Sequence, residues 1–350
     1  MLEPAADDAT AFALDRRNFD YLPDEQASRW RRAFLSTRTQ QLPGPRKLIV
    51  ELLNSCNLDC PVCRVGQHGV NLARAMPHQV FESLLGSVSG LQSIRLNGLG
   101  ESTLLPNFSV YVETLTRRGL GIELITNGSG KLPDYRQVIE HGGHILVSWD
   151  AAQPALFEHL RRPARWSDYI ANLEQIAEAA SVASGGGKCS LIFTLQRHNV
   201  GEVTGVVDLA ARLGIAAVQV NIAKTPTSNW SSQMLGEITG DLASAAGHAR
   251  TAGVMLFVPD QIGGTRLALT GTTTTAASRC AAPWHEVVIR WNGDVQICNM
   301  FNPFTYGNIH RTPLPVIWQN RFAGLFRAKL NSADRHPYCV GCAYMPSAFE

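Results

Sequence analysis

The sequence predicts an α/β protein built on a parallel sheet, followed by a smaller C-terminal unit. From Arg46 onward, short apolar segments alternate with longer segments of helical periodicity. Gly119 and Gly214 stand where two of these helices are expected to end. Near residue 270 the chain becomes small, polar and repetitive over Thr270–Ser278, which we interpret as a linker. We therefore expect three parts, over residues 1–45, 46–270 and 271–350.

The composition is that of an ordinary globular protein. Of 350 residues, 45% are hydrophobic and 17% are charged, and 31 basic against 29 acidic side chains leave a net charge of +2. This balance predicts binding neither to nucleic acid nor to a membrane surface. No apolar run approaches the ~20 residues of a membrane span, and the first residues do not resemble a signal peptide. We expect a cytoplasmic protein whose eight cysteines serve metal or redox chemistry more than disulfides.

The first part, residues 1–45, is expected to be a helical extension. Trp30, Phe34 and Leu35 recur at helical spacing and are expected to dock on the main body. The charged residues of this segment are expected to form a solvated face. We assign no chemistry to it.

The second part contains six expected strands, each followed by a loop or helix. The strands are Leu48–Leu53, Ser93–Leu96, Gly121–Ile125, His144–Ser148, Ser190–Thr194 and Ala217–Val220. The helices between them include Gln79–Val88, Val110–Arg118, Tyr169–Ala180 and Val203–Leu213. In barrels of parallel strands, the chemistry gathers at the C-terminal ends of the strands. The residues just after each strand are therefore the candidates for a site.

Three cysteines follow the first strand at the spacing C-x₃-C-x₂-C, and they are Cys56, Cys60 and Cys63. Four-iron clusters are usually held by four thiolates, so three would leave one iron without a protein ligand. An open position is typical of a catalytic metal centre. A zinc site that adds His68, or a disulfide framework, is the alternative interpretation.

This motif after a first strand resembles that of the radical S-adenosylmethionine (SAM) enzymes, and the resemblance extends from about Arg46 to Met345. It implies a partial (β/α)₆ TIM-like radical SAM barrel, with a SAM-binding 4Fe–4S cluster on the three cysteines. Segments after later strands resemble elements that contact SAM in these enzymes. From this resemblance we expect SAM to be bound by Gly98, Gly100, Glu101, Asn127, Ser148, Asp150, Arg162 and Gln196.

These residues come from four short elements. Gly98–Glu101 resembles the G-G-E motif, whose glycines allow close approach of a ligand and whose glutamate accepts from the SAM ammonium group. Thr126–Ser129 resembles the T-N-G turn, and Val147–Asp150 resembles the V-S-x-D element. Either Arg161 or Arg162 is expected to face the SAM carboxylate, although paired arginines are more often surface charge. Gln196 follows the fifth strand at the rim of the site.

The third part carries a second set of cysteines, Cys280, Cys298, Cys339 and Cys342. Asn292–Asp294 lies between alternating apolar residues, which predicts a hairpin that brings Cys280 and Cys298 together. Four thiolates also suit zinc. The arrangement resembles the auxiliary-cluster domain of radical SAM enzymes, called SPASM in its long form and twitch in its short form. The resemblance implies one auxiliary 4Fe–4S cluster in a small hairpin-and-helix domain.

The resemblance implies an oxidoreductase that cleaves SAM reductively to a 5′-deoxyadenosyl radical. With one auxiliary cluster as electron acceptor, we expect two-electron dehydrogenation of a small polyhydroxylated molecule, an aminocyclitol or amino sugar, in antibiotic biosynthesis. The electron donor is expected to be a flavodoxin or ferredoxin. The alternatives are modification of a ribosomal peptide (cross-link, thioether or epimerisation), sugar epimerisation, or a scaffold without SAM. The short segment before Arg46 is expected to hold no peptide-recognition domain.

Cys189 is the cysteine left after seven are assigned to clusters. It precedes the fifth expected strand and therefore lies at the end of the barrel opposite the chemistry. We expect a packing residue there. An epimerase needs a hydrogen-atom donor such as a thiol, so this position favours oxidation over epimerisation.

Overall fold

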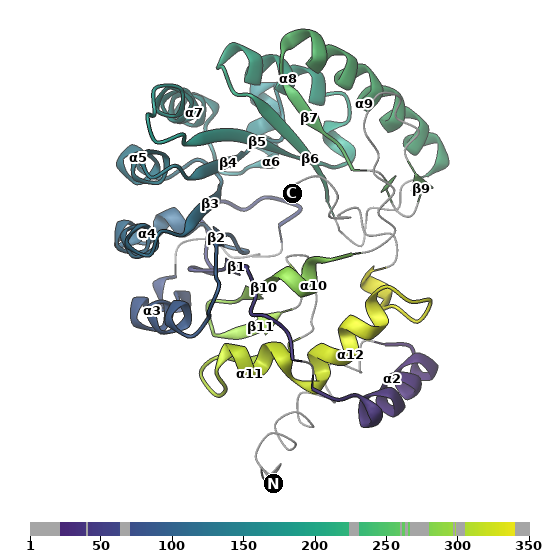
Figure 1. The fold of residues 1–350 in the computed structure, drawn as a ribbon. Helices are drawn as coiled ribbons and strands as arrows, with labels where there is room; N and C mark the ends of the chain where they lie inside the picture. Colours follow the sequence, from purple (N-terminus) through teal and green to yellow (C-terminus); the bar gives the residue numbers. More distant parts are fainter. Residues whose placement is uncertain are drawn as a thin grey trace.

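The computed structural model describes residues 22–39, 41–63, 71–223, 231–259, 261–262, 265–266, 280–296, 298 and 305–339. A ten-stranded sheet runs through this part in the order β12-β11-β10-β1-β2-β3-β4-β5-β6-β7 (Figure 1). It is not closed, because β12 and β7 are its two edges. The predicted α/β fold with a partial, TIM-like barrel is confirmed.

The strands from β1 to β7 are all parallel to their neighbours. Their bounds are β1 (Lys47–Val50), β2 (Ser93–Leu96), β3 (Gly121–Thr126), β4 (His144–Ser148), β5 (Lys188–Leu195), β6 (Ala217–Ile222) and β7 (Met255–Phe257). The outer helices are α3 (His78–Gly86), α4 (Phe108–Arg117), α5 (Leu132–Glu140), α6 (Pro154–Leu160), α7 (Trp166–Ser181), α8 (Val203–Arg212) and α9 (Ser232–Ala252). Figure 1 shows helices α3, α4, α5, α7, α8 and α9 following one another around the outside of the curved sheet.

The remaining elements are short or belong to the two ends of the chain. They are α2 (Asp24–Ser36), η1 (Leu72–Arg74), η2 (Ser102–Leu104), η3 (Arg197–Asn199), β8 (Gln261–Ile262), β9 (Thr265–Arg266), α10 (Ala282–His285), β10 (Glu286–Ile289), β11 (Asp294–Gln296), β12 (Gly307–Asn308), α11 (Leu314–Gln319), α12 (Arg321–Leu330) and η4 (Pro337–Cys339). In the described residues, no helix combines the length and the apolar character needed to cross a membrane.

The strands bury one face under the outer helices. In β2 and β3, Ile94, Leu96, Ile122 and Leu124 are buried, while their neighbours in the chain are partly exposed. This alternation of period two puts apolar side chains on one face of the sheet and polar ones on the other. The apolar face joins the helices in one continuous core. The core therefore fixes the strands, and the loops at their ends are free to carry chemistry.

The predicted boundaries agree closely with the structure in the centre of the sheet. Strands β2 and β4 have the predicted bounds. Gly119 and Gly214 follow α4 and α8 with φ of 64° and 67°, a left-handed conformation that suits glycine at a helix end. Strand β1 ends at Val50 and not at Leu53, because Leu53 makes an isolated antiparallel bridge to Ala75.

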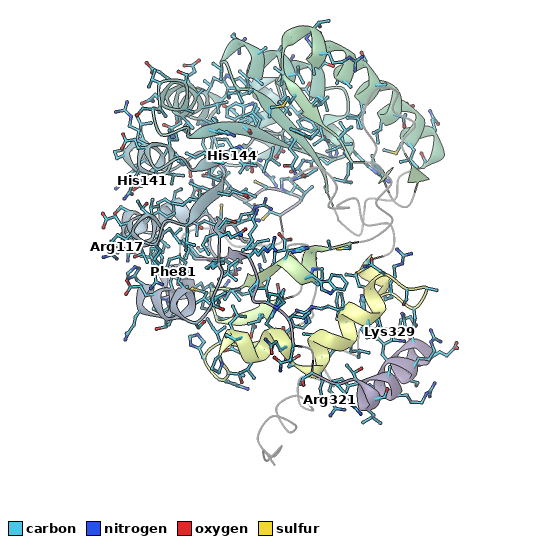
Figure 2. All side chains as sticks on the ribbon, viewed as in Figure 1. Phe81, Arg117, His141, His144, Arg321 and Lys329 are labelled. Carbon is cyan, nitrogen blue, oxygen red and sulfur yellow. The ribbon has the colours of Figure 1, made fainter. Side chains whose placement is uncertain are left out.

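Helix α2 docks on α12 and the segment that follows it. The side chain of Trp30 is completely buried, and its Nε1 donates to the carbonyl of Asp334 at 3.0 Å. Arg321, at the start of α12 (Figure 2), donates to the carbonyls of Phe34 and Leu35 at 3.0 Å. The prediction that Leu35 docks is wrong: its side chain is 74% exposed. It lies five residues after Trp30, about 140° around the helix.

The predicted hairpin is confirmed as β10 and β11, which are antiparallel and joined through Gly293 with a φ of 84°. Strand β10 also pairs in parallel with β1, from Lys47 opposite Glu286 to Val50 opposite Ile289. The C-terminal hairpin therefore extends the main sheet. The predicted linker and the boundary at residue 271 lie outside the described residues, so the division into domains stays a prediction.

Candidate active site

The loops after β1 to β5 meet at the C-terminal edge of the parallel strands. The cysteine loop follows β1, Gly98–Glu101 follows β2, and Asn127 follows β3. Asp150 is the second residue after β4, and Gln196 is the first residue after β5. Hydrogen bonds described below connect these loops to one another. The segments that the sequence singled out are therefore brought together at one edge.

The cysteine loop gathers three free thiols. Cys56 and Cys60 are half-buried and Cys63 is exposed, and none of them forms a disulfide. The backbone N–H of Leu58 donates to the Sγ of Cys56 at 3.4 Å. Burial raises the pKa of Cys56 to about 11 and that of Cys60 to about 12, and each is raised further by the charge of Cys63. Thiols that repel one another as anions suit a cation held between them.

Hydrogen bonds fasten the cysteine loop to the two neighbouring loops. The backbone N–H of Glu101 donates to the carbonyl of Ser55 at 2.9 Å. The Nδ2 of Asn127 donates to the Oδ1 of Asn57 at 2.9 Å and lies 3.5 Å from the Sγ of Cys56. The first thiol is thus positioned by a side chain from the turn after β3.

Glu101 is fully enclosed and accepts four hydrogen bonds. Its Oε1 accepts from the backbone N–H of Thr103 at 3.2 Å, and from the hydroxyls of Thr103 at 2.7 Å and Thr126 at 2.9 Å. Its Oε2 accepts from the N–H of Asn127 at 2.6 Å. Burial raises the pKa of Glu101 above its usual range, against these hydrogen bonds. The carboxylate holds the loops after β2 and β3 together, and contact with a SAM ammonium group stays a prediction.

Gly98 and Gly100 are required by contacts within the protein. A Cβ at Gly100 would lie 2.1 Å from the carbonyl oxygen of Leu53 and 2.5 Å from the N of Ser55. A Cβ at Gly98 would lie 2.3 Å from the Cγ of Glu51. The sequence analysis attributed both glycines to close approach by a ligand. In the structure the segment after β1 occupies that space.

Asp150 and Arg161 form a buried ion pair beside the cysteine loop. The Nη2 of Arg161 donates to the Oδ2 of Asp150 at 2.5 Å, and both residues are about 5% exposed or less. The Nε of Arg161 has no hydrogen-bond partner among the described residues. Arg161 also lowers the pKa of Cys60 against the effect of burial, so its charge reaches that thiol. Arg162 is exposed, and the structure therefore brings Arg161, rather than Arg162, to the site.

A second buried donor lies after β5. Gln196 is 5% exposed, and its Nε2 lacks a partner in the described part of the chain. Its backbone N–H donates to the Oδ1 of Asn199 at 2.8 Å, which completes a capping box at η3. Ser148 is the half-buried last residue of β4. Unpartnered donors at Gln196 and Arg161 fit a ligand that brings carboxylate and hydroxyl oxygens.

The second set of cysteines lies between the hairpin and α12. Its described members are Cys280, Cys298 and Cys339, which are half-buried and form no disulfide, and Cys342 lies outside the described residues. Asn331 holds the backbone of Cys280 from both sides, accepting from its N–H at 2.9 Å and donating to its carbonyl at 3.0 Å. All three thiols act electrostatically on the hydroxyl of Tyr306. The three described ligand candidates therefore lie near the same buried tyrosine.

No three His, Cys, Asp or Glu side chains in the described segments lie close enough together to hold a single metal ion. The two zinc alternatives each use a residue outside those segments, His68 and Cys342.

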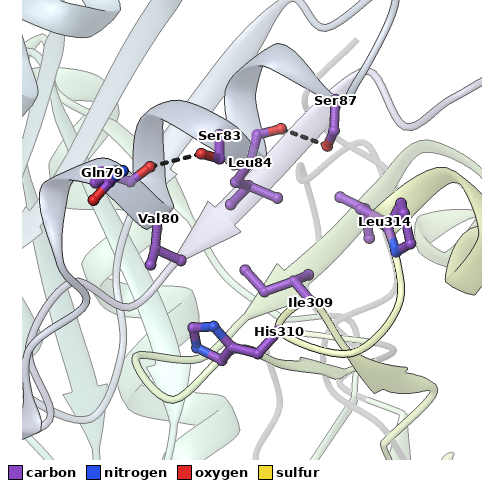
Figure 3. Close-up of a pocket in the computed structure, with 9 residues that line it drawn as sticks. Gln79, Val80, Ser83, Leu84, Ser87, Ile309, His310 and Leu314 are labelled. Carbon is purple, nitrogen blue, oxygen red and sulfur yellow. Dashed lines mark hydrogen bonds between the residues drawn. The ribbon is translucent and has the colours of Figure 1, made fainter.

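A cavity of about 380 Å³ lies between α3 and the segment that joins β12 to α11 (Figure 3). Val80, Leu84, Ile309 and Leu314 give it an apolar wall, and His310 stands at its edge. None of the predicted site residues lines it. We assign it no part in the chemistry.

Cys189 packs in the core, as predicted. It is the second residue of β5 and 8% exposed, and burial raises its pKa to about 12. It shares a strand face with Leu191 and Phe193, which are fully buried. The thiol therefore faces the core together with these two residues.

Comparison with known proteins finds one family model for the C-terminal cysteine region and relatives for most of the chain. A family model for SPASM, an iron–sulfur cluster-binding domain, matches residues 280–343. The PqqA peptide cyclase of Methylobacterium sp. (strain 4-46) is 27% identical over 197 residues, 55% of this chain and 50% of that protein. The chain thus spans about half the length of that relative. The PqqA peptide cyclase of Xanthomonas campestris pv. campestris (strain 8004) is 26% identical over 317 residues, 86% of this chain and 80% of the relative.

The fold is also similar to that of SuiB from Streptococcus suis. The structure of SuiB bound to S-adenosylmethionine has a TM-score of 0.63 at 16% identity, and covers 87% of this chain and 72% of SuiB. The structure of SuiB bound to its precursor peptide SuiA has a TM-score of 0.62 at 15% identity, with 87% and 71% covered. At this identity the similarity establishes the fold.

Proposed function

We propose that the chain is a radical SAM enzyme with a C-terminal SPASM domain, and that it modifies a peptide by abstracting hydrogen and forming or rearranging a bond. The SPASM match, the peptide cyclase relatives and the similarity to SuiB support this proposal. The sequence analysis favoured dehydrogenation of an aminocyclitol and held peptide modification as the alternative. The comparisons support the alternative better, since the curated relatives are PqqA peptide cyclases. Antibiotic biosynthesis and assignment to the oxidoreductases have no specific support.

One observation carries this proposal. Similarity to a PqqA peptide cyclase runs over 317 residues, or 86% of the chain, and so includes both the parallel sheet and the C-terminal unit. Similarity confined to the parallel sheet would say little about the substrate, because enzymes that act on many different substrates share such a fold. The SuiB complex adds that a protein of this fold binds a precursor peptide.

We assign the SAM-binding 4Fe–4S cluster to the cysteine loop after β1, and the auxiliary cluster to the second cysteine set. The ligands proposed are Cys56, Cys60 and Cys63 for the first, and Cys280, Cys298, Cys339 and Cys342 for the second. When bound, these groups supply the 5′-deoxyadenosyl radical that takes a hydrogen atom, and an acceptor for the electron left when a second hydrogen departs as a proton.

The chain itself would bind and orient SAM through two buried donors. The Nε of Arg161, whose Nη2 is fixed on Asp150, suits a carboxylate oxygen. The Nε2 of Gln196 suits a second ligand oxygen. Asn127 orients the cysteine loop through Asn57. These roles replace Arg162 with Arg161 among the proposed SAM contacts.

The test is an anaerobic reaction with SAM and a reductant, followed by mass analysis. One arm contains precursor peptides translated from the reading frames that flank the gene, and the other contains aminocyclitols and amino sugars. We expect 5′-deoxyadenosine together with a peptide lighter by two hydrogens, or changed in configuration. A polyol oxidised by two hydrogens, with every peptide unchanged, would restore the dehydrogenase interpretation. Flavodoxin and ferredoxin serve as alternative reductants in both arms.

A further inference from the structure

Tyr306 is a completely enclosed tyrosine between the C-terminal hairpin and α12. It stands directly before β12, and its backbone N–H donates to the carbonyl of Val295 in β11 at 2.7 Å. Its ring makes edge contacts with Phe322 and Phe326 of α12, at centroid distances of 5.9 and 6.3 Å. The side chain is 1% exposed. Backbone pairing and ring packing therefore fix the direction of its hydroxyl.

That hydroxyl has no hydrogen-bond partner in the part of the chain that the structure describes. Buried hydroxyls are nearly always paired, because removal from water without a new hydrogen bond is unfavourable. The two phenyl rings that pack against Tyr306 offer no acceptor. An unpaired group of this kind in a native structure indicates a partner beyond the described residues, and a bound cofactor is such a partner.

Three members of the second cysteine set lie near this tyrosine. Cys298, Cys339 and Cys280 each act on it electrostatically. Asn331, one residue beyond α12, fixes Cys280. The same helix carries the phenyl rings that hold Tyr306. Phe322 lies at the start of α12 and Asn331 just beyond its end, so one helix supports both Tyr306 and the backbone of Cys280. Tyr306 is also bonded to Val295 in β11, and Cys298 follows that strand by two residues.

A buried positive charge also lies near Tyr306. Arg327 is 2% exposed, and its Nε and Nη1 donate to the carbonyls of Pro283 at 2.7 Å and Trp318 at 2.8 Å. Among the described residues, no carboxylate pairs with it, and its Nη2 has no partner. Its charge acts on Tyr306. A buried cation is unfavourable without a negative partner. An anionic cluster held by four thiolates would supply the negative charge that Arg327 lacks in the described part of the chain.

We propose that the hydroxyl of Tyr306 donates a hydrogen bond to a sulfur of the auxiliary cluster and raises its reduction potential. Hydrogen bonds to the sulfurs are one of the determinants of the potential of an iron–sulfur cluster. The bond is stronger when the cluster is reduced, because the sulfurs then carry more negative charge. This inference rests on the cysteine ligands proposed above.

The test isolates the auxiliary cluster in the full chain by changing Cys56, Cys60 and Cys63 to Ala. Tyr306→Phe is then added, and the potential is measured by redox titration with electron paramagnetic resonance. We expect the same iron content, and a reduction equilibrium constant about tenfold lower, which is a fall of about 59 mV for one electron. An unchanged potential with the iron intact overturns the proposed role of Tyr306 and leaves the ligand assignment standing.

Tyr111→Phe is the matched control. It removes a buried hydroxyl that donates to the carbonyl of Met76 at 2.6 Å, and should leave the potential unchanged. A second measurement needs no tyrosine variant: in D₂O, the reduced auxiliary cluster should show magnetic coupling to one exchangeable hydron. Absence of that coupling overturns the proposal even if Tyr306→Phe fails to fold. If the variant with Cys56, Cys60 and Cys63 changed to Ala contains no iron, the assignment of the second cysteine set as cluster ligands is overturned.

Discussion

Replacing Glu101 by Gln tests whether this carboxylate organises the SAM site. The carboxylate accepts three hydrogen bonds on Oε1 and one, from the N–H of Asn127 at 2.6 Å, on Oε2. Glutamine keeps the first oxygen and turns an amide NH₂ toward Asn127, which is itself a donor. A hydrogen bond to a charged group contributes about 1.5–3 kcal/mol. We expect a loss of about 2 kcal/mol in the free energy of unfolding.

The effect should extend to SAM, because Asn127 also holds the cysteine loop through Asn57. If half of that loss, about 1 kcal/mol, falls on SAM binding, SAM affinity drops by about fivefold, since 1.4 kcal/mol is a factor of ten. Thermal unfolding and titration calorimetry of the iron-loaded, anaerobic protein measure the two effects.

Glu123→Gln is the control for a carboxylate away from the site. Glu123 lies in β3, where its Oε1 accepts from the Nζ of Lys47 at 2.7 Å and its Oε2 from the Nε of Arg95 at 2.6 Å. This variant should lose stability and keep its SAM affinity. Unchanged stability and SAM affinity in Glu101→Gln would refute the role of Glu101. An equal loss of SAM affinity in Glu101→Gln and Glu123→Gln would mean that the effect on SAM binding is not specific to the site.

Three further predictions concern single residues. Burial raises the pKa of Glu123, but its two cationic neighbours lower it further, so the net pKa is below its usual value. The stabilisation is therefore present above the unfolded pKa of about 4.3 and is lost as the pH falls through the folded pKa. The urea midpoints of the wild type and Glu123→Gln should differ at pH 7 and converge toward pH 3, and a constant difference would contradict this. Arg161→Gln should weaken SAM binding at least tenfold, as the loss of a charged hydrogen bond implies, while the exposed Arg162→Gln should not; equal effects measured by calorimetry would argue against the assignment. Cys189→Ala should retain turnover, with stability reduced by about 1 kcal/mol for the small cavity, and loss of turnover together with product labelled from D₂O would indicate a hydrogen donor.

The centre of the fold could be predicted because its signals are local. The bounds of β2 and β4 follow from short apolar runs, and the ends of α4 and α8 from Gly119 and Gly214. The hairpin through Gly293 follows from its turn residues. The pairing of β10 with β1 could not be predicted, because it joins segments more than 200 residues apart with no shared sequence pattern.

The site was predicted at the level of loops, and less well at the level of single atoms. The spacing of the cysteines indicates a metal centre without reference to the rest of the fold. The choice between Arg161 and Arg162 depends on which side chain turns inward after α6, and two adjacent arginines carry no signal for that. The roles of Gly98 and Gly100 depend on the path of the segment after β1. Tyr306 lies outside any motif, and it stands out through burial alone.

The central proposal is that this chain uses SAM to take a hydrogen atom from a peptide. The most direct measurement uses a precursor peptide deuterated at carbon, incubated anaerobically with SAM, a reductant and the iron-loaded chain. We predict that 5′-deoxyadenosine gains one deuterium in proportion to the modified peptide, and that the Cys56, Cys60 and Cys63 alanine variant forms none. Deuterium that enters 5′-deoxyadenosine from a labelled aminocyclitol, and not from any peptide, would contradict the claim.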